Sequence, residues 1–343
     1  MKKIIATLLV VMLCSIAVFA QAAGESKKEI TVLTACTDEE AIVLFEKFEA
    51  DTGIHVNYLR MSVGEAVVRL EAEKDNPQFS LFVGGAVDQH KALAAKGLLD
   101  PYLSKNASNV TAREHLPADQ MYTPFSAVAS CIVSNKDWLK ENGLEAPTSW
   151  AELITPAFKD NVTIAHPGTS GAAYTVLSTL CQLMGVDEAF AYLAQLDKNI
   201  VQYTKSGAAP IRMAGLGETG IAIGYDDDAK TTLKNGYNLI ITYPSEGTGY
   251  EISCAALVKG GPAAEKANAQ AFLDWILGES AQKLWAEELN RTPLNNNIEI
   301  PAGYTPFAQI KLVDLDNDWS AAHKAELVAR FEEQIRSSAN VKK

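Results

Sequence analysis

The residues from 29 to 83 alternate between strand-like and helix-like segments, and this alternation limits the possible folds more than any other feature. Residues 29–34, 55–60 and 79–83 have the short apolar or alternating pattern of strands. Between the first two lies Thr37-Asp38-Glu39-Glu40, a capping box that begins a helix. A β-α-β-α-β order packs helices on a mostly parallel sheet, so we predict an α/β fold.

The length and charge of the chain restrict its architecture and partners. With 343 residues it can bury two hydrophobic cores, so we expect two lobes. The formal net charge is −12, and removing residues 1–23, which carry two lysines and no acid, changes it from −12 to −14. Nucleic acids and anionic membranes bind basic surfaces, so this charge argues against both partners.

The segment 1–23 is typical of a secretory signal peptide, with lysines, then an apolar run, then small residues. We expect cleavage near Ala22 or Ala23 and export to the periplasm. Cys14 follows Leu13, where a lipoprotein signal has a small residue, so we favour a soluble protein over a lipid-anchored one.

The cysteines of the mature chain are widely spaced and contain no CxxC pair, which argues against a zinc site. One or two disulfides are compatible with an oxidising compartment. Cys131 and Cys254 both lie in strand-like segments and are the pair to test first; the other two are Cys36 and Cys181.

Two strand-like segments are expected to cross between the lobes. The first is 126–133, and the second is 252–258, which returns the chain to the first lobe. We therefore divide the chain into a first lobe of residues 27–126 plus 255–343 and a second lobe of residues 127–254.

Two loops in the second lobe precede helices with small and hydroxyl residues. The unpaired N–H groups of a helix start, with the helix dipole behind them, bind anions. Serine and threonine are also ordinary N-caps, but two such loops in one lobe are better explained as one anion site. The residues concerned are Thr169, Ser170, Gly171 and Ala172 in the first loop, and Ser206, Gly207 and Ala208 in the second, ahead of Pro210.

Acidic and glycine residues follow two of the predicted strands. The buried strand 221–224 is followed by Asp226, Asp227 and Asp228, at the strand end where open α/β sheets bind ligands. These acids equally suit a solvated helix N-terminus. The turn at Gly84 and Gly85 would let a ligand approach the backbone closely, or serve as a plain connection that needs glycine.

The irregular segment 243–251 carries acceptors among glycines. Glu246 and Glu251 offer carboxylates, and Thr248 can donate or accept. We include Glu246 and Thr248 in the predicted ligand site.

No catalytic constellation is apparent. The chain has no GxSxG, HExxH or Walker motif, and GLGETG at 215–220 precedes a strand rather than following one. The five histidines are not clustered. We therefore predict a binding protein with no cofactor, not an enzyme.

Five segments of the mature chain carry a resemblance to a known family: FVGGAVDQHKALAAKGLLDPY, HPGTSGAAYT, YTKSGAAP, GYDDDAK and EGTGYEIS. With these segments in the same order, the whole mature chain resembles type II periplasmic binding proteins of the ferric-ion-binding superfamily, which have a two-lobed ferbin or transferrin-like α/β fold with hinge strands. Within that superfamily it is most similar to the branch that includes hexose-phosphate and phosphoglycerate receptors.

The resemblance implies a role for several positions. Iron receptors of this superfamily hold Fe(III) with two adjacent tyrosines, a histidine and a glutamate. In this chain the tyrosine pair is replaced by Asp227 and Asp228. The histidine position falls near Thr37, and the glutamate position falls on Gly85. The metal shell is thus lost, and no metal is expected. The sugar-phosphate branch has His-Asp at the tyrosine pair, so Asp227 departs from it. The anion-binding positions are retained as Ser170, Gly171, Ala172 and Ser206.

We therefore predict the receptor of an ABC importer that captures a hexose phosphate or related organophosphate without chemistry. The phosphate would lie on the two helix starts, and hydroxyls on Asp227, Asp228 and Glu246. The first lobe would close with Thr37 and the Gly84-Gly85 backbone. The expected partner is an inner-membrane ABC permease, which would recognise the closed monomer.

Three alternatives stay open. A ferric receptor would use Asp227, Asp228 and Glu246 as metal ligands. A phosphonate or thiamine-type ligand would fit the same fold. An exported hydrolase would use paired carboxylates such as Asp227 and Glu246, one with a raised pKa.

Overall fold

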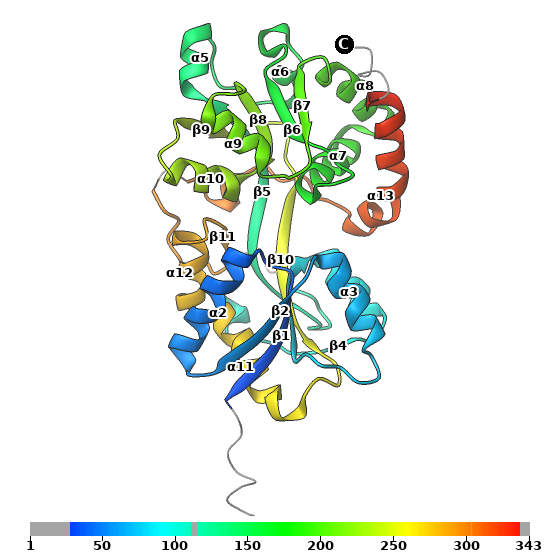
Figure 1. The fold of residues 1–343 in the computed structure, drawn as a ribbon, viewed down its shortest axis with the longest axis vertical. Coiled ribbons are helices and arrows are strands. Elements are labelled where there is room, and N and C mark those ends of the chain that lie inside the picture. The colour runs from blue at the N-terminus through cyan, green and yellow to red at the C-terminus, as the bar shows by residue number, and fades with distance from the viewer. Residues whose placement is uncertain (1–27, 111–115, 303, 337–343) are drawn as a thin grey trace, which may run out of the picture.

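The computed structural model describes residues 28–110, 116–302 and 304–336, and it shows an α/β molecule with two lobes stacked along its long axis (Figure 1). The expected signal peptide, including Cys14, lies outside these residues. None of the described helices is both long and apolar enough to cross a membrane.

The first lobe has a sheet in the order β2-β1-β3-β10-β5, in which β1, β2 and β3 are parallel, and β10 runs antiparallel to β3 and β5. Thr37 and Ser62 each cap a helix in a complete capping box, with Glu40 and Glu65 as the reciprocal partners. The elements are β1 (Glu29–Thr34), α2 (Asp38–Thr52), β2 (His55–Arg60), α3 (Val63–Ala72), β3 (Leu81–Ala86), α4 (Val87–Ala95), β4 (Leu99–Asp100), α11 (Lys266–Ile276), α12 (Glu279–Glu287) and β11 (Thr292–Pro293).

The second lobe continues the sheet as β5-β8-β6-β7, with β9 also paired to β5. Its helices cover two apolar clusters, one on each face of these strands. The elements are α5 (Lys136–Asn142), α6 (Trp150–Leu153), β6 (Val162–Ala165), α7 (Gly171–Met184), α8 (Val186–Leu196), β7 (Ile200–Thr204), α9 (Ala209–Leu216), β8 (Ile221–Tyr225), α10 (Asp226–Lys234) and β9 (Leu239–Thr242).

Two long strands join the lobes: β5 (Thr123–Asn135) and β10 (Tyr250–Val258). The first half of β5 pairs with β10, and its second half pairs with β8 and β9 in the other lobe. Every residue of β5 is buried, because the strand passes through both cores. These strands include the segments 126–133 and 252–258 that were expected to cross.

Helix α13 (Asn317–Phe331) differs from the expected division, which placed all of 255–343 in the first lobe. Its apolar side chains Leu327 and Phe331 are buried in the core of the second lobe, as is Ile335 after it. The apolar face of this helix was visible in the sequence, but the pattern does not say which core the face covers. The chain thus crosses a third time, between β11 and α13 (Figure 1).

The cysteines also differ from expectation. Cys36, Cys131, Cys181 and Cys254 are all free and buried. On β5 and β10, Cys254 pairs with Pro124, seven residues from Cys131. At about 3.3 Å per residue the two thiols are roughly 23 Å apart along the strand, too far for a disulfide.

Candidate ligand-binding cleft

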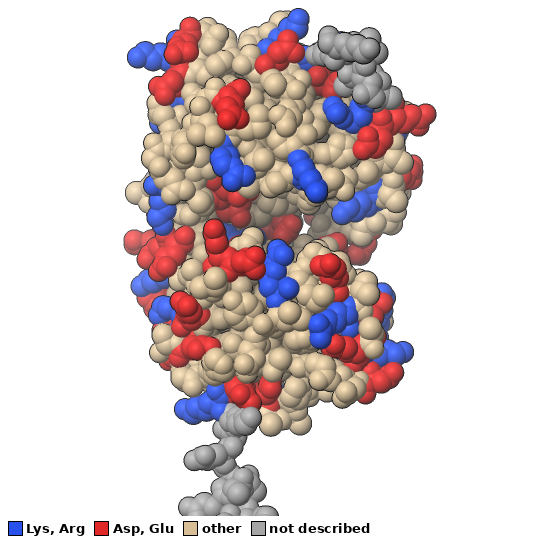
Figure 2. Space-filling view, in the orientation of Figure 1, with Lys and Arg blue, Asp and Glu red and all other residues tan. Residues whose placement is uncertain are grey.

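A cleft of about 1510 Å³ lies between the lobes. Figure 2 shows the molecule hollowed at this level. Most of the lining comes from the first lobe, including the ends of β1 and β3 and the start of α4. The second lobe contributes the first turns of α7 and part of α13, through residues such as Gly171, Thr175 and Ser320.

The structure brings together the two loops predicted to hold an anion. Ser170 caps α7 by accepting a hydrogen bond from the N–H of Ala173, and Gly171 lines the cleft. A Cβ atom at Gly207 would lie 2.9 Å from the Ser170 hydroxyl oxygen, so the loops are in direct contact. Thr169 ties them further, because its hydroxyl donates to the Lys205 carbonyl at 2.9 Å.

The start of α9 has no side chain capping it. Ala208 occupies the N-cap position without a capping hydrogen bond, and Pro210 lies in the first turn. Ser206 is exposed, and Ala172 is buried behind Gly171. The starts of α7 and α9 are therefore in contact, but of the predicted anion-site residues only Gly171 lines the cleft.

The first-lobe residues predicted for closure line the cleft: Thr37, Gly84 and Gly85. Both glycines have positive φ, 92° and 79°. A Cβ atom at Gly84 would lie 2.8 Å from the Cys36 nitrogen, so only glycine fits there. The turn therefore requires glycine for its conformation, and it also lines the cleft, so the two interpretations of it are compatible.

The three consecutive acids at the start of α10 have different environments. Asp226 is fully buried and accepts hydrogen bonds from the N–H of Ala129, the Tyr243 hydroxyl and the Lys230 ammonium, the last at 2.7 Å. This carboxylate is satisfied within the second lobe. Its role is structural, but it is not the solvated helix N-terminus that the sequence also allowed, because it is fully buried.

Asp227 and Asp228 lie beside the cleft but are not among the residues that line it. Burial raises the pKa of Asp227 to about 7, against the opposing effect of Arg291. Burial likewise raises the pKa of Asp228 to about 6. One Asp227 oxygen accepts the N–H of Asp228 at 2.8 Å, and the other lies 3.7 Å from a guanidinium nitrogen of Arg291.

Arg291 is a buried cation on the first-lobe wall that sequence reasoning missed. Its guanidinium donates to Glu40 at 2.9 Å and to the Ser253 hydroxyl at 2.9 Å, and the side chain is only 12% exposed. The surrounding carboxylates raise its pKa despite burial. Nothing in the local sequence, NRTPLN, distinguishes this arginine from a surface residue.

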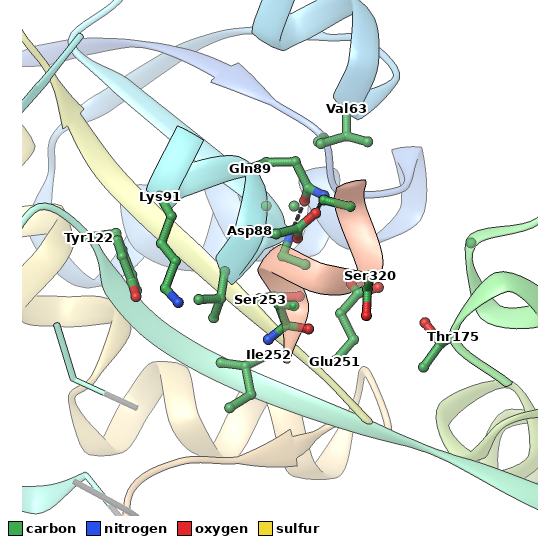
Figure 3. A pocket seen from close by; sticks show the side chains of 18 of the residues that line it. Val63, Asp88, Gln89, Lys91, Tyr122, Thr175, Glu251, Ile252, Ser253 and Ser320 are labelled. Carbon is green, nitrogen blue, oxygen red and sulfur yellow. Dashed lines mark hydrogen bonds between the residues drawn. The ribbon is translucent and has the colours of Figure 1, made fainter. Parts of the chain in front are cut away.

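A hydrogen-bonded chain crosses the floor of the cleft. The hydroxyls of Thr175 and Tyr225 are 2.8 Å apart, and Tyr225 donates to Oε2 of Glu251 at 3.2 Å. Burial raises the pKa of Glu251, and it also raises the pKa of Asp88 at the start of α4. Figure 3 shows Asp88, Glu251 and Thr175 around the same pocket.

Glu246 and Thr248 are separate from the cleft lining. Both carboxylate oxygens of Glu246 accept backbone N–H groups at the start of α6, from Trp150 and Ala151. Thr248 is fully buried and donates to the Ser130 carbonyl at 2.8 Å. Their hydrogen-bonding groups hold the segment before β10, which corrects the expectation that they face a ligand.

The geometry defines a class before any comparison: two lobes joined by hinge strands around one polar cleft form a protein that closes on a small solute. The chain matches the bacterial extracellular solute-binding protein family over residues 43–307, and it belongs to that family. It is a solute-binding protein rather than an enzyme, as predicted.

Two curated relatives show the range of the family. An uncharacterized protein of Haemophilus influenzae is 31% identical over 322 residues, covering 91% of this chain and 92% of the relative. A Salmonella typhimurium protein, provisionally named for periplasmic 2-aminoethylphosphonate binding, is 27% identical and covers 75% of this chain and 74% of its own length.

Solved structures confirm the type II periplasmic binding protein fold. AfuA of Actinobacillus pleuropneumoniae, solved with exogenous fructose-6-phosphate bound, has a TM-score of 0.76 and 30% identity, covering 90% of this chain and 98% of its own. The periplasmic binding protein P5PA has a TM-score of 0.73 and 27% identity, with 90% and 99% coverage. Iron-bound HitA of Pseudomonas aeruginosa, at 21% identity and a TM-score of 0.75 over 88% and 98%, shares the fold.

Proposed function

We propose that this protein is the periplasmic receptor of an ABC importer and that its ligand is a phosphorylated small molecule, either a hexose phosphate or a related organophosphate. The ligand docks on the second lobe, and the first lobe closes over it by a hinge motion of β5 and β10. An inner-membrane permease then recognises the closed monomer. No bond is made or broken.

The observation that carries this proposal is the contact between two helix starts, one of which opens onto the cleft. Gly171 exposes the first turn of α7 to the cleft, and Gly207 brings the uncapped start of α9 against Ser170. The first turn of each helix has backbone N–H groups without a partner in its own helix, and the positive end of its dipole lies there. A phosphoryl group is satisfied by such donors without a full opposing charge.

Two of the relatives share a phosphoryl group in the compound they are solved with or named for, and differ in the rest of it. AfuA was solved with fructose-6-phosphate, and the Salmonella protein is named for an aminoalkylphosphonate. Both compounds carry an oxyanion of the same shape. The shared chemistry supports an organophosphate ligand for this chain.

The iron alternative has less support from the geometry. Glu246, one of its three proposed ligands, already binds the first N–H groups of α6. Across the described part of the chain, no group of three or more His, Cys, Asp and Glu side chains is arranged to hold a metal ion. The likeness to iron-bound HitA extends to the fold alone.

Calorimetric titration of the mature, ligand-stripped protein tests the proposal. Glucose-6-phosphate and fructose-6-phosphate are titrated beside plain glucose, inorganic phosphate and Fe(III)-citrate. We expect saturable binding of at least one phosphate ester and none of glucose. Binding of iron with a visible charge-transfer band, and no response to any phosphoryl compound, would overturn it.

A further inference from the structure

We propose that Asp88 and Glu251 form an ammonium subsite on the first-lobe wall, so that the ligand carries a primary amine as well as its phosphoryl group. This inference rests on the proposed function and specifies its ligand class: an aminosugar phosphate or an aminoalkylphosphonate. The second lobe would hold the anionic end and the first lobe the cationic end.

The register between β3 and β10 places Asp88 and Glu251 on neighbouring parts of the first-lobe wall, near enough that Asp88 raises the pKa of Glu251. Ser253 on β10 pairs with Ala86, the last residue of β3. Glu251 lies two residues before Ser253 on β10, and Asp88 lies two residues after Ala86. Because β3 and β10 are antiparallel, both positions lie on the side toward the second lobe. Both line the cleft, on adjacent elements (Figure 3).

Each carboxylate retains capacity to accept a hydrogen bond. Tyr225 donates to Oε2 of Glu251, and the structure describes no hydrogen bond to Oε1. Gln89 donates to Oδ2 of Asp88 at 2.5 Å. Among the described residues, neither carboxylate forms an ion pair. A primary ammonium has three donors and can bind both at once, whereas a hydroxyl has one.

The charged groups around the pair are engaged elsewhere. Arg291 influences Glu251 but binds Glu40 and Ser253. Lys324 on α13 influences Asp88, yet its ammonium lies 5.0 Å from the ring centre of Tyr174.

The remaining neighbours do not supply the missing positive charge. Lys91 pairs with Asp318 at 3.8 Å. The other charged neighbours are acidic: Asp318 repels Asp88, and Glu40 repels Glu251. Asp88 and Glu251 also repel each other. Burial disfavours the ionised form of both carboxyls. A cationic ligand group recovers this lost solvation, and a neutral hydroxyl does not.

The subsite also accounts for closure. A ligand whose phosphoryl group binds the starts of α7 and α9 must reach across the cleft to meet Asp88 and Glu251. Only a molecule with both ends contacts both lobes through charge. Phosphate alone, or an amine alone, gains half of these contacts and stabilises the closed form less.

Matched ligand pairs test the inference by calorimetry at pH 7.5. One pair is glucosamine-6-phosphate and glucose-6-phosphate, and the other is 2-aminoethylphosphonate and ethylphosphonate. We expect the amine to bind at least about tenfold more tightly in at least one pair. The advantage should shrink toward pH 5, because protonation of the two carboxyls removes their charge while ionisation of the phosphoryl group affects both members of a pair alike.

Glu251→Gln and Asp88→Asn should each reduce the advantage to about threefold or less, with little change for the amine-free compound. Asp119→Asn is the matched control: this exposed carboxylate on the cleft rim caps the N–H of Met121, and the advantage should persist. Apo melting curves verify that each variant folds.

The outcomes separate the two proposals. Equal binding of amine and amine-free members in both pairs, or an advantage that survives both Glu251→Gln and Asp88→Asn, overturns the ammonium subsite and leaves the phosphoryl site standing. Failure of every phosphoryl compound to bind overturns the proposed function together with the subsite.

Discussion

The two walls of the cleft carry their polarity in different ways. The first-lobe wall uses charged side chains, with Arg291 packed against Glu40 and Glu251 nearby. The part of the second-lobe wall that we propose binds the anion uses backbone amides and the hydroxyl of Ser170 beside Gly171, with no formal charge. A neutral wall built from helix starts can bind an anion in a protein of net charge −12, and its donors do not titrate. The charged wall should respond to pH and to loss of one partner.

Arg291→Gln is expected to have the largest effect, because it removes the cation from the charged wall. Glu40 would then be buried without its partner, and breaking a buried pair in this way costs about 3–5 kcal/mol of unfolding free energy. Urea unfolding at pH 7.5 measures the loss. The control is Arg60→Gln, an exposed arginine on the same wall, for which we expect less than about 1 kcal/mol. Similar losses in both variants would contradict a special role for Arg291.

Asp227→Asn should raise the free energy of unfolding, whereas removing a charged group that has partners usually lowers it. The pKa of Asp227 is raised on folding from 3.8 to about 7, so the folded protein binds its proton more tightly than the unfolded chain. This group therefore lowers stability as pH rises from about 4 to 7. The Asn variant should be more stable than the wild type by up to about 4 kcal/mol at pH 7.5, and the difference should disappear near pH 4.

Glu40→Gln provides the opposite case, on the first-lobe wall. Arg291 and hydrogen bonds lower the pKa of Glu40 on folding, although burial opposes them. The ionised Glu40 therefore stabilises the fold above its unfolded pKa, and this stabilisation is lost as the pH falls. Relative to the wild type, Glu40→Gln should lose more stability at pH 7.5 than at pH 4. Urea unfolding across this range checks both variants. Parallel pH profiles would show that the charged wall does not titrate as described.

Gly207→Val tests the neutral wall. A Cβ atom at Gly207 already meets the Ser170 hydroxyl at 2.9 Å and the Ala172 Cβ at 3.3 Å, so a larger side chain must separate the loops. We expect at least tenfold weaker binding of a phosphate ester, measured by calorimetry, with melting little changed. Val201→Ala, at an exposed position of β7 outside the cleft lining, is the control and should bind normally. Unchanged affinity in Gly207→Val would place the phosphoryl group elsewhere.

Much of this contrast could be predicted from local sequence, because helix starts and strand ends have local signals. The loops at 169–172 and 206–208 are marked by small and hydroxyl residues ahead of helices, and the structure places them in contact. The acidic run after β8 is also visible, but only packing decides that Asp226 is buried with Lys230 while Asp227 faces Arg291.

The charged wall could not be assembled from sequence, because its members are far apart in the chain. Glu40 and Arg291 are separated by 251 positions and meet only in the folded protein. Glu246 shows the reverse error: an acid among glycines has the sequence signature of a ligand acceptor, yet it binds the start of α6. Similarly, the apolar face of α13 indicates burial without indicating which core receives it.

Lys91→Ala should have the smallest effect, although its ion pair spans the two lobes at the cleft mouth. The Lys91 ammonium lies 3.8 Å from Asp318 on α13, and the two side chains are 48% and 73% exposed. Water screens such a pair, and ordering two long side chains offsets its attraction, so it contributes about 0–1 kcal/mol. We expect less than a threefold change in ligand affinity at 0.15 M salt, and a smaller one at 1 M salt. Asp318→Asn should match it, since it removes the same pair from the other lobe. A tenfold change in either variant would mean that charges at the mouth, rather than contacts within the two walls, control closure.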